Sequence, residues 1–253
     1  MKLASLLRPF RAAPAGATPM LPTIRSCART HAGRVRAINE DRLLDRPERG
    51  LWAVADGMGG HSAGDVAASI VIRALADVAG GEQAISCDAV LDALRDANAA
   101  IHARSSDAVS GSTVAALHIE RSRFTLFWAG DSRVYRLGEH GLERLSRDHS
   151  VVQALVDSGA IAPEQARHHP QANVITRALG TGDAVDIEVA AGTVSPGDVF
   201  LLCSDGLSGF VPDDMIALHL TLPIEIAADA LLSDALAAGG ADNITLVLVA
   251  IPH

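Results

Sequence analysis

Four aspartates stand where short apolar runs of the chain meet glycine-rich or polar turns: Asp56, Asp131, Asp205 and Asp242. Residues 51–55 and 199–203 lead into the first and third of them, and residues 244–250 follow the last. Strands that end together gather such side chains at one end of a sheet, where carboxylates without counter-charges raise one another's pKa values. Divalent cations relieve that repulsion. The sequence therefore predicts a metalloenzyme.

The apolar runs also predict the fold class, because short turns join several of them. Strands are expected at residues 51–55, 113–119, 124–129, 133–137, 186–190, 199–203 and 244–250. The connections at 120–123 and 130–132 are too short for a helical crossover, so residues 113–137 are predicted to form an antiparallel meander. This argues against a purely parallel, doubly wound sheet.

Three amphipathic segments predict helices that cover the sheets. Residues 65–78 are expected to bury Val66, Ile70, Ala74 and Val78, and residues 88–103 to bury Val90, Leu94, Ala97 and Ile101. A third helix is expected at about 224–238, where Gly239 and Gly240 end it before Asp242.

Charge and cysteine content narrow the function classes. The formal charge of −9 argues against a nucleic-acid partner, whose phosphates this chain would repel, and so against a nuclease. Cys27, Cys87 and Cys203 are odd in number and widely spaced, which favours neither a disulfide framework nor a thiolate zinc site and fits a reducing cytoplasm. A cysteine phosphatase would need an arginine six residues after Cys203, where this chain has Gly209, so Cys203 is predicted to be a small buried strand residue.

The composition changes along the chain predict its domain organisation. Residues 1–23 contain Lys2, Arg8 and Arg11 but no acidic residue, and are predicted to be a disordered basic tail. Residues 24–253 are predicted to form one domain, in which the polar stretch 145–180 makes a flap-like subdomain. No apolar stretch approaches the roughly 20 residues that cross a bilayer, so no membrane association is expected.

Several short motifs follow one another in the order found in a known family. They are Arg36, Asn39-Glu40-Asp41, residues 54–61, Gly111-Ser112-Thr113, Gly130-Asp131-Ser132-Arg133, Asp148-His149-Ser150, residues 176–180, Ser204-Asp205-Gly206 and Asp242-Asn243-Ile244-Thr245. Together, over about residues 30–251, they resemble the PP2C-type, metal-dependent serine/threonine protein phosphatases of bacteria. A single motif of this set carries little information, whereas the whole ordered set is specific.

This resemblance implies an α+β fold, a four-layer α/β/β/α sandwich with two central antiparallel sheets flanked by helices. It also implies a site for two Mn²⁺ or Mg²⁺ ions, in which Asp56 bridges both ions, Asp205 and Asp242 hold one, and Glu40 and the Gly57 carbonyl hold the other. Ligands that are all oxygen suit these ions. Relatives with a third ion place another aspartate where this chain has Gly209, so a third ion at Asp131 and Asp205 is expected to bind weakly.

The implied reaction is hydrolysis of phosphoserine and phosphothreonine by direct attack of a hydroxide that bridges two cations about 4 Å apart. Arg36 is placed to hold the phosphate through a forked pair of hydrogen bonds. His61 is a candidate to protonate the leaving oxygen, although a role in orienting water at the metal is left open at this point. Asp148 is predicted to cap a helix, and Asn243 to fix Asp242 through its side chain.

Phosphorylated proteins and a cognate serine/threonine kinase are the partners that the resemblance implies, and a cytoplasmic monomer is expected. Residues 45–52 resemble phosphatases associated with type VI secretion, which oppose a threonine kinase. The alternative is a catalytically weak or inactive phosphopeptide-binding regulatory module on the same fold. Retention of Glu40, Asp56, Asp205 and Asp242 counts against that alternative.

Overall fold

Two five-stranded antiparallel sheets stack face to face in the computed structural model, which describes residues 24–59, 63–104, 110–167 and 169–252. The first sheet has the strand order β1-β12-β11-β8-β9, the second has the order β10-β7-β6-β3-β2, and β4 pairs with β5. The strands are β1 (Arg25–His31), β2 (Arg42–Arg46), β3 (Leu51–Ala55), β4 (Gly57–Met58), β5 (Gly111–Ser112), β6 (Val114–Glu120), β7 (Arg123–Ala129), β8 (Arg133–Gly138), β9 (Gly141–Arg144), β10 (Glu188–Thr193), β11 (Val199–Cys203) and β12 (Ile244–Ala250).

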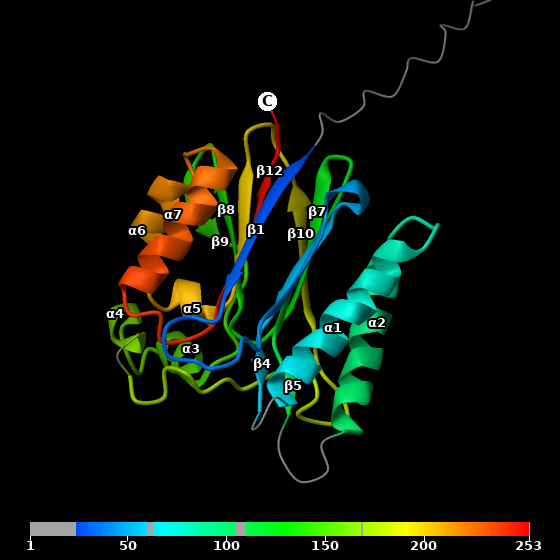
Figure 1. The fold of residues 1–253 in the computed structure, drawn as a ribbon, viewed down its shortest axis with the longest axis horizontal. Coiled ribbons are helices and arrows are strands. Elements are labelled where there is room, and N and C mark those ends of the chain that lie inside the picture. Colours follow the sequence, from blue (N-terminus) through cyan, green and yellow to red (C-terminus); the bar gives the residue numbers. More distant parts are fainter. Residues whose placement is uncertain (1–23, 60–62, 105–109, 168, 253) are drawn as a thin grey trace, which may run out of the picture.

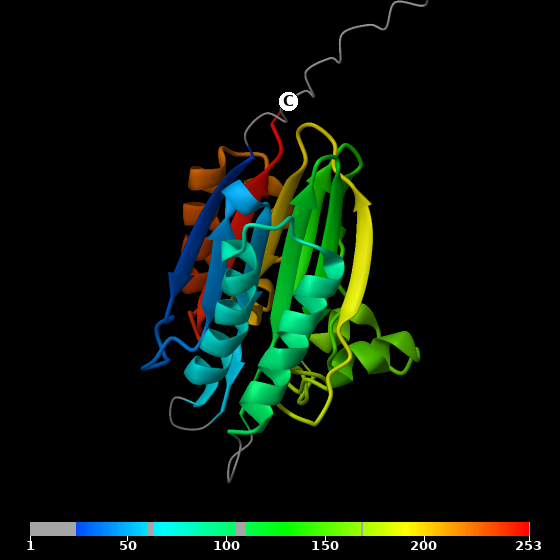
Figure 2. The same ribbon diagram turned by 90° about the vertical axis from the view of Figure 1, so that its right-hand side faces the viewer.

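Helices cover both outer faces of this pair of sheets (Figure 1). They are α1 (Ala63–Gly80), α2 (Cys87–His102), α3 (Val151–Asp157), α4 (Pro163–Ala166), α5 (Asp205–Ser208), α6 (Asp213–His219) and α7 (Ile224–Ala237), with a short 3-10 helix at Pro47–Arg49. Helices α1 and α2 lie side by side on the second sheet, and α6 and α7 lie on the first (Figures 1 and 2). The predicted four-layer sandwich is confirmed.

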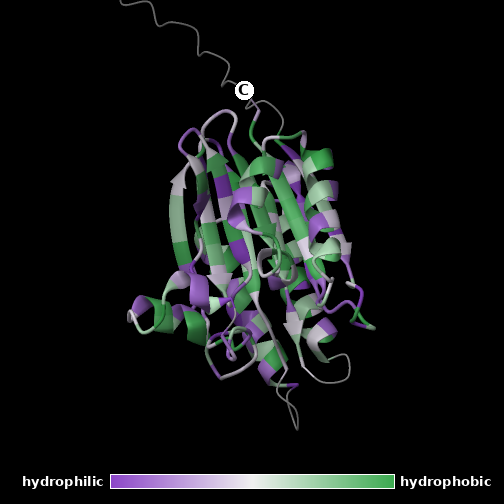
Figure 3. Cartoon of the chain, turned by 90° about the vertical axis from the view of Figure 1, so that its left-hand side faces the viewer, coloured by the Kyte–Doolittle hydropathy of each residue, from purple (hydrophilic) through white to green (hydrophobic). Residues whose placement is uncertain are grey.

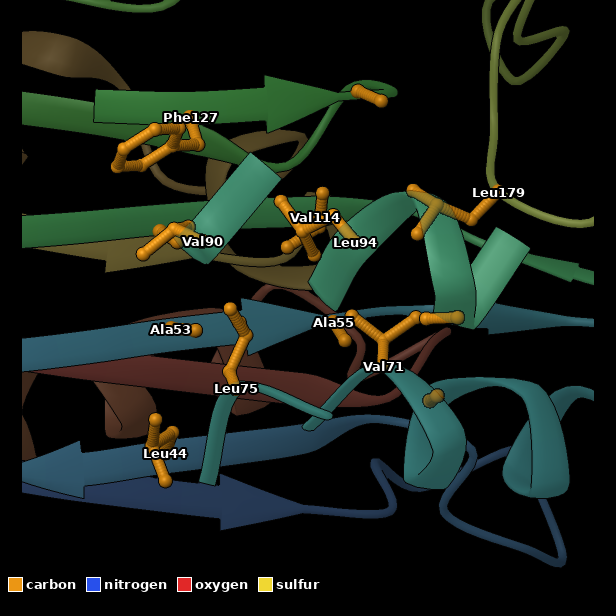
Figure 4. Close-up of a cluster of buried hydrophobic side chains, with 14 of the residues drawn as sticks. Leu44, Ala53, Ala55, Val71, Leu75, Val90, Leu94, Val114, Phe127 and Leu179 are labelled. Carbon is orange, nitrogen blue, oxygen red and sulfur yellow. The ribbon is translucent and has the colours of Figure 1, made fainter. Parts of the chain in front are cut away.

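Strand periodicity decides which layer each side chain enters, since successive side chains point to opposite faces. In β3, Leu51, Ala53 and Ala55 pack under α1 and α2 (Figure 4). Trp52 and Val54 point the other way, between the sheets, where they meet apolar residues of β11 and β12. Every residue of β3 is therefore buried, and Figure 3 shows green, hydrophobic segments within the sheets beside purple, hydrophilic ones.

The predicted apolar face of α1 is partly correct: Ile70, Ala74 and Val78 pack partly buried against the core, but the fully buried stripe is rotated away from them. The residues that are buried along this helix are Gly64, Ala67, Ala68, Val71, Leu75 and Ala79. Val66 is instead 43% exposed. The polar residues Asp65, Ser69, Arg73 and Asp77 recur every four positions, and the buried stripe lies on the opposite side of the helix from them. The predicted face of α2, from Val90 to Ile101, is confirmed.

The predicted meander over residues 113–137 is correct only in its first half. Strands β6 and β7 pair as an antiparallel hairpin, but β8 pairs with β11 in the other sheet. The short turn 130–132 thus carries the chain from one sheet to the sheet stacked on it, a step of about 10 Å. Gly130 has φ +112°, and a Cβ there would lie 2.6 Å from the methyl carbon of Thr113. This crossing places Asp131 at the end of the sandwich.

Three strands of the main sheets were not predicted. Strands β1 and β2 carry arginines, and the four-residue β9 is mostly exposed, so none shows a long apolar run. Strand β10 begins at Glu188, two residues later than expected.

Residues 145–180 contain α3 and α4, while the tail prediction concerns residues outside the described ranges. None of the helices in those ranges is long and apolar enough to cross a membrane.

Candidate metal centre

The predicted acidic residues lie on separate connections at one end of the sandwich, the lower end in Figure 1. Asp56 lies between β3 and β4, Asp131 between β7 and β8, and Glu40 just before β2. Asp205 is the first residue of α5, and Asp242 lies between α7 and β12. The antiparallel pairing of β11 with β12 and with β8 brings these connections to the same end.

Asp56 is at the centre of the acidic cluster. Burial raises its pKa well above the ordinary value, and four other carboxylates raise it further: Asp41, Asp205, Asp131 and Asp242. A group that interacts with carboxylates from four separate connections must lie among them, because charge interactions weaken with distance. The fold therefore produces the convergence that the strand-end aspartates predicted.

Asp205 has an unpaired oxygen inside this cluster. Its Oδ1 is buried without a hydrogen-bond partner. Burial raises the pKa of Asp205, the charge of Asp242 raises it too, and a side-chain hydrogen bond with Asp56 opposes them.

Arg36 neutralises Asp242. The Nε and Nη2 atoms of Arg36 donate to Oδ1 and Oδ2 of Asp242 at 2.9 and 2.8 Å, a forked ion pair. The arginine side chain is 55% exposed and the aspartate side chain 32% exposed. The guanidinium of Arg36, which is expected to bind phosphate, thus lies against the carboxylate of Asp242, which is expected to bind metal.

Asn243 holds the loop that carries Arg36, which corrects the role predicted for it. Its Nδ2 donates to the carbonyl oxygens of Ala32 and Ile38, both at 2.9 Å, and its Oδ1 accepts from the backbone N–H of Glu40 at 2.8 Å. Only its backbone N–H reaches Asp242 Oδ1, at 2.9 Å. The side chain of Asn243 therefore positions Glu40 rather than Asp242.

The backbone around Gly57 is too tightly packed to admit a side chain. A Cβ on Gly57 would lie 2.0 Å from the carbonyl oxygen of Gly64 and 2.9 Å from that of Glu40. A Cβ on Gly64 would lie 2.8 Å from Oε1 of Glu40. The start of α1, the Gly57 backbone and the Glu40 carboxylate therefore lie in contact, as expected if Glu40 and the Gly57 carbonyl hold one ion.

Asp131 is half-buried beside Asp205, and its place in a weak third site stays a prediction. Burial raises its pKa to about 7, with further contributions from the charges of Asp205 and Asp148. Gly209 is exposed at the end of α5, and a Cβ there would lie 2.8 Å from the carbonyl oxygen of Asp205. Gly209 offers no side-chain ligand to a third ion.

Asp148 does not cap α3, contrary to the sequence prediction. Ser150 is the N-cap residue, and its side chain accepts from the backbone N–H of Gln153 at 3.2 Å. Asp148 instead accepts from Nε and Nη2 of Arg133, the latter at 2.7 Å from Oδ2. This largely buried ion pair connects the turn that holds Asp131 to the start of the 145–180 stretch.

Asp41 is a member of the cluster to which the sequence analysis gave no role. It is 2% exposed, its Oδ2 accepts from the Ser204 hydroxyl at 2.8 Å, and its Oδ1 has no hydrogen-bond partner. Burial raises the pKa of Asp41 to about 7. The signal that could have found it is its position directly after Glu40.

Two other predicted residues have different outcomes. His61 lies outside the described residues, so its role stays a prediction. Cys203 is fully buried, and burial raises the pKa of its thiol to about 12, which confirms a structural rather than a nucleophilic role.

The donor set fits divalent cations, although its side chains are not yet arranged around one. In the described ranges, no three acidic, histidine or cysteine side chains stand together as a ready metal-binding group. The Arg36–Asp242 ion pair occupies one carboxylate that a cation would use. The buried unpaired oxygen of Asp205 and the all-oxygen donors match Mg²⁺ or Mn²⁺.

The two stacked antiparallel sheets with flanking helices match solved structures of bacterial serine/threonine phosphatases. The chain belongs to the Protein phosphatase 2C family, whose profile matches residues 30–239. The serine/threonine protein phosphatase PstP of Mycobacterium tuberculosis is 42% identical to it over 232 residues, which cover 89% of this chain. The match covers 44% of PstP, so this chain spans less than half the length of that relative.

Solved structures agree with the sequence comparison. The catalytic domain of PstP in complex with two manganese ions superposes with a TM-score of 0.83 at 39% identity, covering 91% of this chain and 99% of that one. PppA, described as a key regulatory component of the type VI secretion system in Pseudomonas aeruginosa, gives a TM-score of 0.81 at 38% identity and covers 91% and 98%. The predicted family resemblance is confirmed.

Proposed function

We propose that this chain is a metal-dependent protein phosphatase that hydrolyses phosphoserine and phosphothreonine in proteins. The observation that carries the proposal is the convergence of carboxylates from separate connections around Asp56, beside an exposed arginine. Membership of the Protein phosphatase 2C family and the two manganese ions in the PstP structure support it. Two Mn²⁺ or Mg²⁺ ions are the proposed cofactors.

We assign a separate set of ligands to each of the two ions, and Asp56 belongs to both sets. Asp205 and Asp242 are assigned to one ion, Glu40 and the carbonyl of Gly57 to the other, and Asp56 to both. Asp131 with Asp205 is assigned to a weak third ion. When bound, the cations neutralise the carboxylates and supply Lewis-acid activation of the attacking water.

Side chains around the cluster are proposed to bind the phosphate, orient water and protonate the leaving oxygen. Arg36 binds the substrate phosphate, because its planar guanidinium offers paired donors to phosphate oxygens and its side chain is exposed. Asp41 keeps an unpaired oxygen inside the cluster, which suits it to orient water there. His61 stays our candidate for protonating the leaving oxygen.

The biological setting that we propose follows from relatives. A bacterial phosphatase of this kind opposes a cognate serine/threonine kinase and acts on phosphorylated proteins in the cytoplasm, as a monomer. The similarity to PppA supports a link with type VI secretion.

The direct test is phosphate release from a phosphothreonine peptide and from p-nitrophenyl phosphate, measured with Mn²⁺, Mg²⁺ or EDTA. We expect turnover with either cation, none in EDTA, and a loss of at least about 10³-fold in Asp56→Asn. Asp77→Asn, which changes an exposed aspartate of α1, is the matched control and retains activity. A folded protein without turnover even in millimolar Mn²⁺ contradicts the proposal and favours the phosphopeptide-binding module.

A further inference from the structure

The loop between β1 and β2 presents two branched apolar side chains next to Arg36. Val35 is 70% exposed and Ile38 is 49% exposed. Residues 34–38 are all exposed, so these side chains extend from the same short segment as the arginine. The loop lies at the acidic end of the sandwich, where its carbonyl groups contact Asn243 and Arg36 reaches Asp242.

Hydrogen bonds from Arg34 and Asn243 hold this loop against the segment before β12. The backbone N–H of Arg34 donates to the carbonyl oxygen of Gly240 at 2.7 Å, and Asn243 binds the carbonyls of Ala32 and Ile38. Gly33 has φ +80°, and a Cβ there would lie 2.2 Å from the carbonyl oxygen of Asp242. The two apolar side chains therefore contribute little to the loop's own stability, and the loop holds them in fixed positions.

The charge of the loop defines the kind of partner. Residues 33–38 carry Arg34 and Arg36 and no acidic residue, in a chain whose formal charge is −9. Arg34 forms no ion pair with any residue in the described ranges. Cationic and apolar side chains that alternate on one exposed segment complement a ligand that is both anionic and apolar, such as a phosphorylated residue with aliphatic neighbours.

We propose that Val35 and Ile38 form a subsite for apolar side chains on either side of the substrate's phosphorylated residue. The inference rests on the proposed function, because it takes Arg36 as the anchor for phosphate. An extended peptide advances about 3.3 Å per residue, so its nearest neighbours lie within about 7 Å of the phosphorylated residue. The substrates favoured by this chain are proteins in which valine, isoleucine or leucine flanks phosphothreonine or phosphoserine.

The test compares two phosphothreonine peptides that differ only in the residues flanking the phosphothreonine, valine and leucine in one and serine in the other. We expect kcat/KM to be about tenfold higher for the apolar peptide, which corresponds to about 1.4 kcal/mol. The double variant Val35→Ser, Ile38→Ser should reduce this ratio to about one. Because the ratio is measured within each protein, a general change in activity cancels.

The matched control is Ile226→Ser, which removes another exposed branched side chain, 56% exposed in α7. Ile226 lies near the start of β1, because its neighbour Glu225 pairs with Arg25. Val35 and Ile38 lie beyond the other end of β1, so the control residue is far from the proposed subsite. The ratio of about ten should persist in this variant. Thermal unfolding of each variant checks that the fold is retained.

Each outcome separates this inference from the function on which it rests. Hydrolysis of p-nitrophenyl phosphate and both peptides with a wild-type ratio near one overturns the subsite and leaves the phosphatase proposal intact. A ratio of ten that survives in the double variant overturns the assignment to this loop. A folded protein that hydrolyses none of the three substrates overturns both proposals.

Discussion

Arg36 and Asp242 form a forked ion pair in which both carboxylate oxygens of the aspartate accept hydrogen bonds from one guanidinium, at 2.9 and 2.8 Å. The two residues are 206 positions apart in the chain. The pair joins the proposed phosphate-binding residue to a proposed metal ligand, so a cation that binds Asp242 competes with Arg36. Binding of the cation would then release the guanidinium toward the substrate.

This competition predicts that Arg36→Gln binds Mn²⁺ more tightly than the wild type. Exposed ion pairs contribute up to about 1 kcal/mol, so we expect a dissociation constant about two- to fivefold lower by isothermal titration calorimetry. The KM for a phosphopeptide should rise in the same variant, because the phosphate loses its forked partner. Arg34→Gln, two residues away, is the control and should leave metal affinity unchanged; weaker Mn²⁺ binding in Arg36→Gln would show that the pair supports the site.

The acidic cluster predicts that the metal-free protein loses stability as pH rises toward neutrality. Burial raises the pKa values of Asp41 and Asp131 to about 7, against about 3.9 in an unfolded chain. The folded state therefore keeps protons between about pH 4 and pH 7 that the unfolded state has released. The stabilisation of the folded state by these retained protons is fully present below the unfolded pKa, and it is lost as pH rises through the folded pKa.

Urea unfolding in EDTA between pH 5 and pH 8 measures this dependence. We expect the free energy of unfolding to fall by at least about 2 kcal/mol across that range, and Asp131→Asn to flatten the slope. Saturating Mn²⁺ should remove the decline, because cations bind the deprotonated carboxylates. Stability in EDTA that grows toward pH 8 would be inconsistent with the raised pKa values.

Gly209 predicts a way to strengthen the third cation site. Gly209→Asp would supply the carboxylate that this chain lacks next to Asp131 and Asp205, so the Mn²⁺ concentration for half-maximal activity should fall severalfold. The added Cβ meets the carbonyl oxygen of Asp205 at 2.8 Å, and we expect a loss of about 1 kcal/mol in stability. Gly209→Asn has the same shape without the charge and should keep the wild-type Mn²⁺ requirement; equal behaviour of the two variants would argue against an ionic third site.

The Arg133–Asp148 pair predicts a structural cost in the 145–180 stretch. Asp148→Asn leaves Arg133 without its main counter-charge, and the side chains are only 22% and 8% exposed. We expect the free energy of unfolding to fall by about 3 kcal/mol. Glu143→Gln, which breaks the more exposed Arg136–Glu143 pair, should cost less than about 1 kcal/mol. Similar small losses in both variants would mean that the buried pair is not a major connection.

The sequence predicted those features of the site that depend on local pattern. Apolar runs of strand length bounded by turns placed Asp56, Asp205 and Asp242 at strand ends, and the bounds of β3, β11 and β12 agree with the structure. Such residues converge because antiparallel strands end together. The ordered motifs then indicated the family.

Features that depend on packing between distant segments could not be predicted in this way. The crossing between sheets at Gly130 depends on the partner that β8 selects, β11, which is over 60 residues away. The role of Asn243 depends on the loop before β2 folding back onto it. The burial of Asp41 follows from its contact with Ser204, and no local pattern marks that contact.

The central claim is that the carboxylates around Asp56 together hold two divalent cations, and counting bound Mn²⁺ tests it most directly. Isothermal titration calorimetry at pH 7.5 should find two ions per wild-type chain. Asp56→Asn should lose both, because its carboxylate is assigned to each ion, while Glu40→Gln should lose one and Asp77→Asn neither. Two ions bound by Asp56→Asn with wild-type affinity would contradict the account.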